Sequence, residues 1–390
     1  MGDLHESSIT AAEKLAPLLR SEAEEAEQLR SVTPAVMEAT AESGLCSLVA
    51  PTSRGGEGAG LETLADVTRI LAHGCPATAW TLSFLILHNW FITRFPEPAQ
   101  AAVFAQRPYG LVPAPLSPTG RLSAVDGGYR LSGSWDWATG VNHGDWVMLH
   151  AVDEAVMAGT VKGFPTRFAL VPVGAVTVED VWFTSGMCAT GSNRVVAEDL
   201  CVEEGFTIPG DRMLDCGIGP DPMDALPLMA VLGLVASASA LGAAEAAVEM
   251  FSERMRERVL AYTLRDRQAD QPAARVRLAT ATAEVRAAAA YWRSTIDSLA
   301  DSAASADGAT ESDRGAARLA AAATVKMSRS AISIVCEGSG ASVYARSSPL
   351  QRIQRDVEVL KGHVVFDWDR SAELAGRIQL GMDLGATEMV

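Results

Sequence analysis

The feature that most constrains the fold of this chain is a pattern of residue types that changes twice along its length. Up to about residue 108, apolar residues recur at the three- and four-residue spacing of amphipathic helices, as at Leu61 and Leu64. Residues 109–215 carry short β-branched and aromatic runs between turn residues, and residues 216–390 are Ala-rich helix formers again. This order predicts a mainly α fold with an inserted β domain: an N-terminal helical domain (1–108), a middle β-barrel-like domain (109–215) and a C-terminal four-helix bundle (216–390).

Composition narrows the partners that such a protein can have. A formal net charge of -16 repels nucleic-acid phosphates and anionic lipid, so we expect no nucleic acid and no membrane among its partners. The six cysteines form no CxxC pair, which argues against a disulfide framework and against a zinc site. Together with an N-terminus unlike a signal peptide, they predict a cytoplasmic protein whose ligands are small molecules or other proteins.

Two stretches of the sequence superficially resemble a membrane span and a nucleotide-binding loop. The uncharged stretch 225–244 is close to the length of a membrane span, but its many small residues favour a buried helix in a bundle. The Gly-rich loop at 55–60 does not follow a strand and lacks dinucleotide-loop spacing. No HExxH, P-loop or paired-carboxylate motif occurs, so no metal is expected.

Three blocks of sequence carry a resemblance to a known family. Gly127–Gly140 contains a Tyr-x-x-x-Gly strand that leads into Trp-Ala-Thr-Gly. Glu337–Ser342 is Gly-rich and is followed by Arg352, Arg355 and Asp356, and Pro51–Gly56 precedes an amphipathic helix. On these blocks the chain resembles the acyl-CoA dehydrogenase superfamily over nearly its whole length.

The dehydrogenases' base is not found where the resemblance puts it. Abstraction of an α-proton from a thioester needs a carboxylate beside the substrate. In the run after Asp356, Val364 stands at about the position of the glutamate and His363 directly precedes it. The stretch 226–241, where some relatives carry the acid, has none, since Asp224 and Glu245 lie beyond its ends.

Other features resemble the flavin monooxygenase branch of the superfamily. They are Leu87–Trp90 before Phe95–Glu97, Ala138–Gly140 before His143, and the Arg-Asp pair before His363. The resemblance implies the oxygenase component of a two-component flavin-dependent monooxygenase. Such an enzyme takes reduced flavin (FADH2 or FMNH2) and O2, forms a C4a-(hydro)peroxyflavin, and hydroxylates a small aromatic or polycyclic substrate or oxidises an amine nitrogen.

The same resemblance implies partners. A separate flavin reductase would supply the electrons, since the chain lacks a nicotinamide-binding fingerprint, and the fold usually assembles as a homo-oligomer, a tetramer or dimer. Two alternatives remain open at this point: an acyl-CoA or acyl-carrier dehydrogenase or desaturase with bound FAD, and a binding or scaffold protein that has lost catalysis. The sequence does not distinguish FMN from FAD.

Catalytic roles follow from the resemblance for three residues. His363 would donate a hydrogen bond near the flavin ring, with a capping or solvated histidine as the alternative. Thr139 would face flavin N5, with a plain turn threonine as the alternative. His88 would contact substrate, together with Ser117, although a core histidine and a turn serine are the ordinary interpretations; His143 is expected to be structural.

Cofactor contacts form a second set. The resemblance implies that the hairpin end would touch the isoalloxazine ring, and that the Gly-rich segment and a nearby arginine would approach the phosphate or adenine of a neighbouring subunit's flavin. The alternatives are a core tryptophan, a helix-ending glycine turn and a solvated arginine. The expected flavin-binding residues are Trp137, Ala138, Thr139, Gly140, Arg258, Gly338, Ser339 and Gly340.

Overall fold

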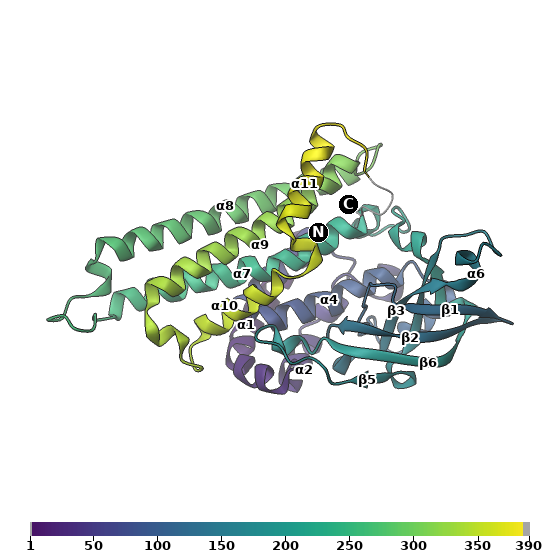
Figure 1. The fold of residues 1–390 in the computed structure, drawn as a ribbon, viewed down its shortest axis with the longest axis horizontal. Helices are drawn as coiled ribbons and strands as arrows, with labels where there is room; N and C mark the ends of the chain where they lie inside the picture. Colours follow the sequence, from purple (N-terminus) through teal and green to yellow (C-terminus); the bar gives the residue numbers. More distant parts are fainter. Residues whose placement is uncertain (1, 385–390) are drawn as a thin grey trace.

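The computed structural model describes residues 2–384, in which a helical part, a sheet and a second helical part follow one another along the chain. Helices from the first hundred residues pack beside a twisted sheet, and a long helical bundle extends away from both (Figure 1). The N-terminal helices are α1 (Gly2–Leu29), α2 (Pro34–Glu42), α3 (Leu61–Ala72), α4 (Pro76–Ile92) and α5 (Glu97–Val103). The predicted limits at residues 108 and 215 fall in connecting segments, before β1 and after the last short helix of the sheet domain.

Helix α4 is the centre of the N-terminal part. It begins with Pro76, whose fixed φ suits the first helical turn, and all but one of its side chains are buried. A helix that is apolar on every side must be surrounded by protein, and α4 packs against α3, α7 and α10. It therefore contacts both helical parts of the molecule and lies beside the sheet domain.

The middle part is one seven-stranded sheet with the order β5-β6-β2-β1-β3-β4-β7. Its strands are β1 (Gly120–Val125), β2 (Gly128–Ala138), β3 (Trp146–Asp153), β4 (Thr166–Pro172), β5 (Thr177–Glu179), β6 (Asn193–Glu203) and β7 (Thr207–Pro209), with the short helix α6 (Glu154–Met157) after β3. The sequence Asp126-Gly127-Gly128 predicts a tight hairpin turn, and the structure confirms it, because Val125 pairs with Gly128 across a two-residue loop in which Gly127 has a φ of +77°.

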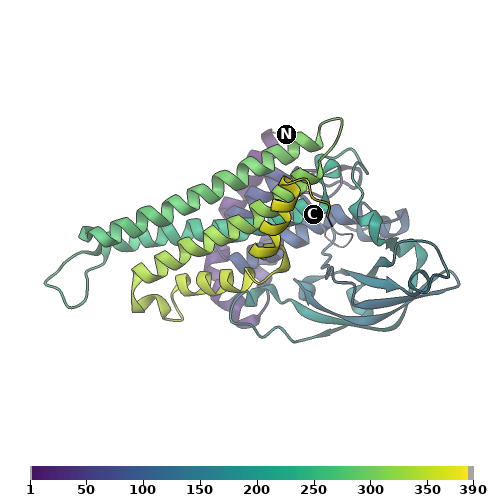
Figure 2. The same cartoon turned by 45° about the horizontal axis from the view of Figure 1, so that its top comes forward.

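The C-terminal part is a bundle of three long and two shorter helices. These are α7 (Leu228–Glu257), α8 (Pro272–Ala303), α9 (Glu311–Ser339), α10 (Pro349–Leu360) and α11 (Trp368–Gln379). Helices α7 and α9 are long and apolar enough to cross a membrane, yet 89% and 61% of their most apolar windows are buried inside the protein. The stretch 225–244 thus forms the core of the bundle. The loop between α7 and α8 projects from the end of the bundle farthest from the sheet (Figure 2).

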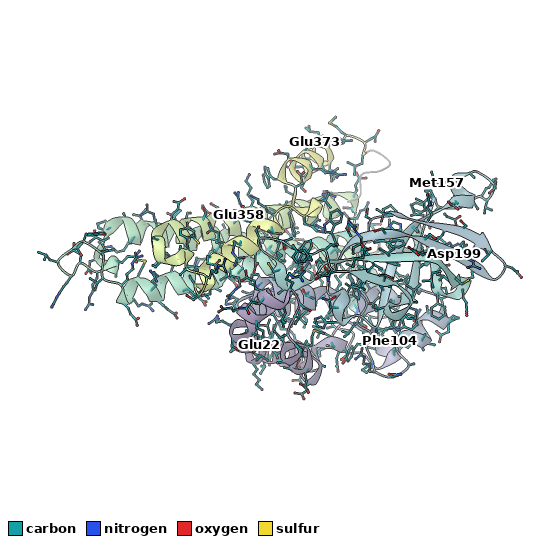
Figure 3. All side chains as sticks on the ribbon, turned by 60° about the horizontal axis from the view of Figure 1, so that its bottom comes forward. Glu22, Phe104, Met157, Asp199, Glu358 and Glu373 are labelled. Carbon is teal, nitrogen blue, oxygen red and sulfur yellow. The ribbon has the colours of Figure 1, made fainter. Side chains whose placement is uncertain are left out.

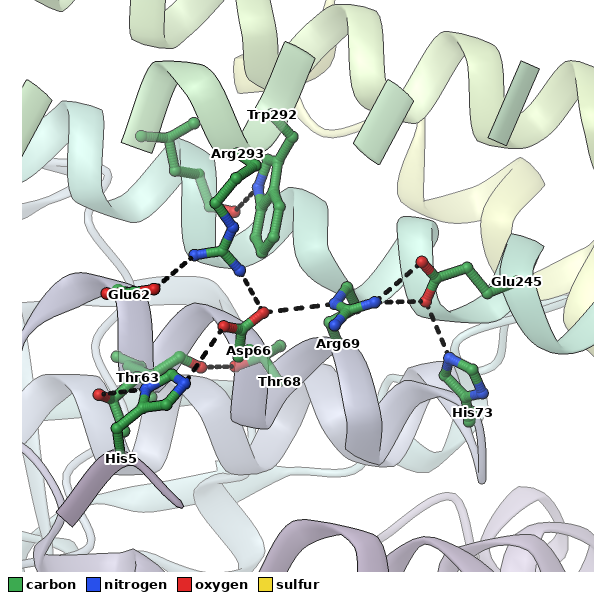
Figure 4. A network of polar contacts seen from close by, with 12 residues as sticks. His5, Glu62, Thr63, Asp66, Thr68, Arg69, His73, Glu245, Trp292 and Arg293 are labelled. Carbon is green, nitrogen blue, oxygen red and sulfur yellow. Dashed lines mark hydrogen bonds and ion pairs between the residues drawn. The ribbon is translucent and has the colours of Figure 1, made fainter. Parts of the chain in front are cut away.

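A polar network joins the two helical parts (Figure 4). Arg69 of α3 donates to Glu245 of α7 at 2.9 and 3.1 Å, and His73 lies 2.9 Å from the same carboxylate. Asp66 pairs with Arg69 and with Arg293 of α8. Burial opposes ionisation of Glu245, but the hydrogen bonds from His73 and Arg69 prevail and lower its pKa. The network therefore fixes α3 against the bundle.

The surface agrees with the negative charge of the chain. Exposed acids such as Asp199 and Glu373 project from the sheet and from the last helix (Figure 3). All six cysteines are free, and burial raises the pKa of Cys75 to about 11. The buried thiol of Cys75 is thus kept protonated.

Candidate active site

A row of aromatic rings runs along one face of α4. Trp80 meets Phe84 edge-on with ring centroids 4.8 Å apart, Phe84 lies 5.6 Å from His88, and His88 lies 4.8 Å from Phe91. Spacings of four, four and three residues place side chains above one another on a helix. The row is an apolar wall of flat side chains that contains one imidazole.

His88 has a defined tautomer within this wall. Its Nδ1 lies 2.6 Å from the carbonyl oxygen of Val112, which only accepts, so Nδ1 carries the proton and Nε2 presents a lone pair. Burial lowers the pKa of His88 to about 4, although the bond to Val112 opposes the effect. At neutral pH the side chain is an uncharged hydrogen-bond acceptor. Ser117 lies five residues after Val112 on the same segment and is exposed.

His363 lies at the other end of the row. Its ring centroid is 5.6 Å from that of Trp80 and 5.9 Å from that of Phe366. The Val365 amide donates to its Nδ1 at 3.3 Å and caps the short helix η11 (Val364–Phe366), which leaves Nε2–H as the donor of the neutral ring. His363 is exposed to solvent at the end of the row, and the protein packed around its ring partly desolvates it, which lowers its pKa.

The end of β2 meets the same helix. The register of β2 against β6 shifts between Trp135 and Ala138, and this bulge holds Trp137 at a φ of +64°. Trp137 is 66% exposed, so it is not a core tryptophan, whereas Ala138 is fully buried. Gly140 has a φ of +72°, and a Cβ there would lie 2.9 Å from Thr81 Cγ2 of α4.

Thr139, half-buried, follows Trp137 at this strand end, and its Oγ1 lies 2.9 Å from Ser192 Oγ. Through Gly140 and Thr81 the strand end contacts the first turns of α4, where Trp80 also meets His363. The structure therefore brings the Thr139 segment, His363 and His88 to one helix.

The remaining predicted flavin contacts form a separate cluster at the far end of the bundle. Arg258 Nη1 donates to the Ser339 carbonyl, and Gln268 Nε2 donates to that of Gly338 at 2.6 Å. Gly338 and Ser339 complete the last turn of α9 and do not form the predicted turn, and Ser339 Oγ bonds back to the Val335 carbonyl. Only Gly340, with a φ of +71°, turns the chain.

The two clusters are far apart within one chain. Val365, beside His363, faces Gly233 of α7, with Cγ2 3.5 Å from where a Cβ on that glycine would stand. Arg258 is twenty-five residues further along, just past the end of α7, which corresponds to roughly 37 Å at the rise of an α-helix. An extended flavin dinucleotide is shorter than this, so one flavin cannot contact both clusters of the same chain.

The acids nearest in sequence to a dehydrogenase-type base are engaged elsewhere. Asp224 accepts from the Trp90 indole at 3.2 Å and from the Asp221 amide at 3.1 Å, and Glu245 is held by Arg69 and His73. Burial raises the pKa of Asp224, in keeping with a structural cap. Among residues 2–384, neither carboxylate is free to abstract a proton.

The sequence alone did not identify several residues of the site. Trp80 and Phe84 were not selected, although their spacing from His88 along a helix would have revealed them. Ser192 lies next to Thr139 because β2 pairs with β6. The spacing of the two residues along the chain does not indicate that contact. Asp356 was noted as part of a motif but without a role; its Oδ1 accepts from the Met187 amide at 2.6 Å.

Fold and site together define a class: a helix–sheet–helix protein of the acyl-CoA dehydrogenase type in which α4 carries a row of aromatic rings with one imidazole in it and a second imidazole at its end. The family models of the acyl-CoA dehydrogenase N-terminal and C-terminal domains match residues 8–107 and 234–368. The pigment production hydroxylase of Rhodococcus sp. (strain ATCC 21145) is 31% identical over 379 residues, covering 94% of this chain and 95% of the relative.

Two further relatives name the branch. The flavin-dependent monooxygenase oxygenase subunit HsaA of Rhodococcus jostii is 30% identical over 390 residues, covering 96% of this chain and 98% of that protein. The structure of XiaF from Streptomyces sp. in complex with FADH2 and glycerol superposes with a TM-score of 0.93 at 29% identity, covering 100% of this chain and 98% of XiaF. The chain belongs to the acyl-CoA dehydrogenase superfamily, in its branch of flavin-dependent monooxygenases, and is an oxidoreductase.

Proposed function

We propose that this protein is the oxygenase component of a two-component monooxygenase that takes FADH2 from a separate reductase and hydroxylates a small aromatic substrate. The observation that carries the proposal is the row of rings on α4, where His363 is followed by Val364 and not by a carboxylate, and where aromatic rings lead to His88. Among residues 2–384, the ring contacts of this row include no carboxylate that could abstract an α-proton. An aromatic wall and two imidazoles suit a planar phenol-like substrate.

The residues at the end of β2 fit a flavin ring. Trp137 offers an uncovered indole, and Gly140, where a Cβ would clash with Thr81, lets the strand end pack closely on α4. Bound reduced flavin supplies two electrons and activates O2 at its C4a carbon. Thr139 would contact N5, and the Nε2–H of His363 would donate a hydrogen bond toward the oxygen being transferred.

His88 orients the substrate in this proposal. Its neutral Nε2 accepts a hydrogen bond from a phenolic hydroxyl, because a pKa of about 4 keeps the ring uncharged and Val112 fixes the tautomer. His88→Phe removes this acceptor while keeping a flat ring, so we expect KM for a phenol to rise about tenfold, with unchanged flavin affinity. Ser117 is a second candidate for this contact, and Ser117→Ala beside His88→Phe compares the two.

The distal cluster supports a homo-oligomer, a dimer or tetramer. Arg258 and the Gly338–Gly340 segment would contact the phosphates or adenine of a flavin bound to a neighbouring copy. Arg258→Ala should then weaken binding of FADH2 but not of FMNH2, which lacks the adenylate. Mixed oligomers of Arg258→Ala and Thr139→Val chains should regain activity that neither variant has alone. Loss of FMNH2 binding in Arg258→Ala would contradict this assignment.

The test of the function uses anaerobically reduced FAD, the purified protein and a panel of phenols mixed with isotopically labelled O2. We expect one labelled oxygen atom in the product and no product without reduced flavin. Bleaching of protein-bound oxidised flavin by an acyl-CoA, without oxygen incorporation, would instead identify a dehydrogenase. A cytoplasmic location fits this chemistry, since the reductase draws on cellular nicotinamide cofactors.

A further inference from the structure

Behind Thr139 lies a chain of hydroxyl groups that the chemistry above does not use. Thr139 Oγ1 is 2.9 Å from Ser192 Oγ, which is 2.7 Å from Thr190 Oγ1, which in turn is 2.8 Å from the carbonyl oxygen of Met187. Thr190 and Ser192 are 1% and 4% exposed, so water does not compete for these contacts. Thr139, which is half-buried, is the outer end of the chain.

The carbonyl at the other end fixes the direction of every hydrogen bond. A carbonyl oxygen only accepts, so Thr190 must donate its single hydroxyl proton to Met187. Ser192 must then donate to Thr190, and Thr139 must donate to Ser192. The hydroxyl proton of Thr139 therefore points inward to Ser192, which leaves the outer side of this oxygen as an acceptor.

The buried end of the chain is held in place by two further bonds. The Met187 amide donates to Asp356 Oδ1 at 2.6 Å, which ties this turn to α10. The Gly140 amide donates to the Thr190 carbonyl at 2.9 Å, which ties the turn to the end of β2. Because both ends are anchored, the hydroxyl groups keep their distances and the order of donors and acceptors is stable.

We propose that this hydroxyl chain makes the site selective for reduced over oxidised flavin, with Ser192 and Thr190 as positioning residues that act through Thr139. The inference rests on the proposed function, in which Thr139 faces flavin N5. Reduced flavin carries a proton on N5 and is a donor there, whereas oxidised flavin presents a lone pair. An acceptor-only Thr139 bonds the first and repels the second, which suits an enzyme that must capture FADH2 and release FAD.

The test is the ratio of dissociation constants for oxidised and anaerobically reduced FAD, measured by flavin fluorescence and by equilibrium dialysis under nitrogen. We expect the wild-type protein to bind reduced FAD at least about tenfold more tightly, the value of one hydrogen bond gained or lost. Ser192→Ala frees the Thr139 proton, and Thr190→Val lets Ser192 donate to Thr139. Both variants should bind oxidised FAD more tightly and lose most of the tenfold preference.

Controls separate positioning from general damage. Thr190→Ser keeps the hydroxyl and should keep the preference, and so should Thr184→Val, which removes a hydroxyl-to-carbonyl bond from the same segment but not from the chain. In Thr139→Val the preference is already lost, so adding Ser192→Ala should change nothing further. Melting temperatures verify that each variant is folded.

The outcomes are distinct. An unchanged ratio in folded Ser192→Ala and Thr190→Val, or an additional effect of Ser192→Ala on Thr139→Val, overturns the inference. A wild-type protein that binds both redox states equally also overturns it. If the wild-type protein prefers reduced FAD but incorporates no oxygen into any substrate, the proposed function fails while the selectivity stands.

Discussion

Asp356 should make the stability of this protein depend on pH in an unusual direction. The carboxyl is 3% exposed, and its Oδ2 has no hydrogen-bond partner among residues 2–384. Arg352 and Arg355, its neighbours on α10, are both paired with Glu27 of α1, at 2.9 and 2.7 Å. Burial therefore dominates over the Met187 hydrogen bond and the arginine charges, and it raises the pKa of Asp356 from 3.8 to about 7.

The sign follows from proton binding. Between pH 4 and 7 the native state holds the proton on Asp356 and the unfolded chain does not, so stability is greatest below the unfolded pKa and falls as pH rises through the native one. The full pKa difference corresponds to about 4 kcal/mol, of which about 2–3 kcal/mol is lost between pH 5 and 8. This is opposite to the behaviour of a salt-bridged aspartate.

Asp356→Asn isolates the effect. The asparagine Oδ1 still accepts from the Met187 amide, but its NH2 group has no acceptor and should cost about 1–3 kcal/mol at all pH values. Urea unfolding followed by tryptophan fluorescence at pH 5 to 8 should show the wild-type advantage shrinking by about 2–3 kcal/mol across that range. The exposed Asp297→Asn serves as control. A difference between wild type and Asp356→Asn that stays constant with pH would refute the argument and indicate a carboxylate ionised throughout.

Three further outcomes are expected. His363→Ala removes the Nε2–H donor, so the ratio of hydroxylated product to hydrogen peroxide should fall by at least about tenfold while flavin reoxidation continues. An unchanged ratio would exclude a role of His363 in the oxygen transfer. Gly340→Ala forces a side chain into a glycine-only conformation and against Arg258, so it should cost about 1–3 kcal/mol in urea unfolding and weaken FADH2 binding. Glu245→Gln removes the carboxylate that Arg69 and His73 of α3 contact, so the unfolding free energy at pH 7 should fall by about 1–3 kcal/mol. The pKa of Glu245 is lowered in the native state, so its stabilising contribution is lost as pH falls. The substitution should therefore cost less at pH 4 than at pH 7.

The fold could be predicted from sequence because its signals are local. Periodicity identified the helical parts, and Asp126-Gly127 identified the hairpin, since each pattern reports on neighbouring residues only. Glycine usually ends helices, which predicts a turn at Gly338, but Arg258 and Gln268 donate to the Ser339 and Gly338 carbonyls and satisfy the last turn of α9. Side chains from a distant segment override the local propensity there.

The site was less accessible to such reasoning because it is assembled from distant segments. Thr139 and His363 were selected through resemblance, and their meeting at Trp80 and Thr81 depends on how β2 and α10 pack on α4. The polarity of the hydroxyl chain requires three interatomic distances and the identity of one carbonyl. No composition or spacing contains that information.

The spacing of three rings on one rigid helix lets the middle ring change without disturbing its neighbours. Trp80, Phe84 and His88 occupy successive turns of α4, about 6 Å apart along its axis. Trp80 contacts His363 and His88 bonds to Val112, and neither contact involves Phe84. We therefore expect a smaller side chain at Phe84 to leave both imidazoles anchored, and under the proposed function this position is where the size of an accepted ring system would change.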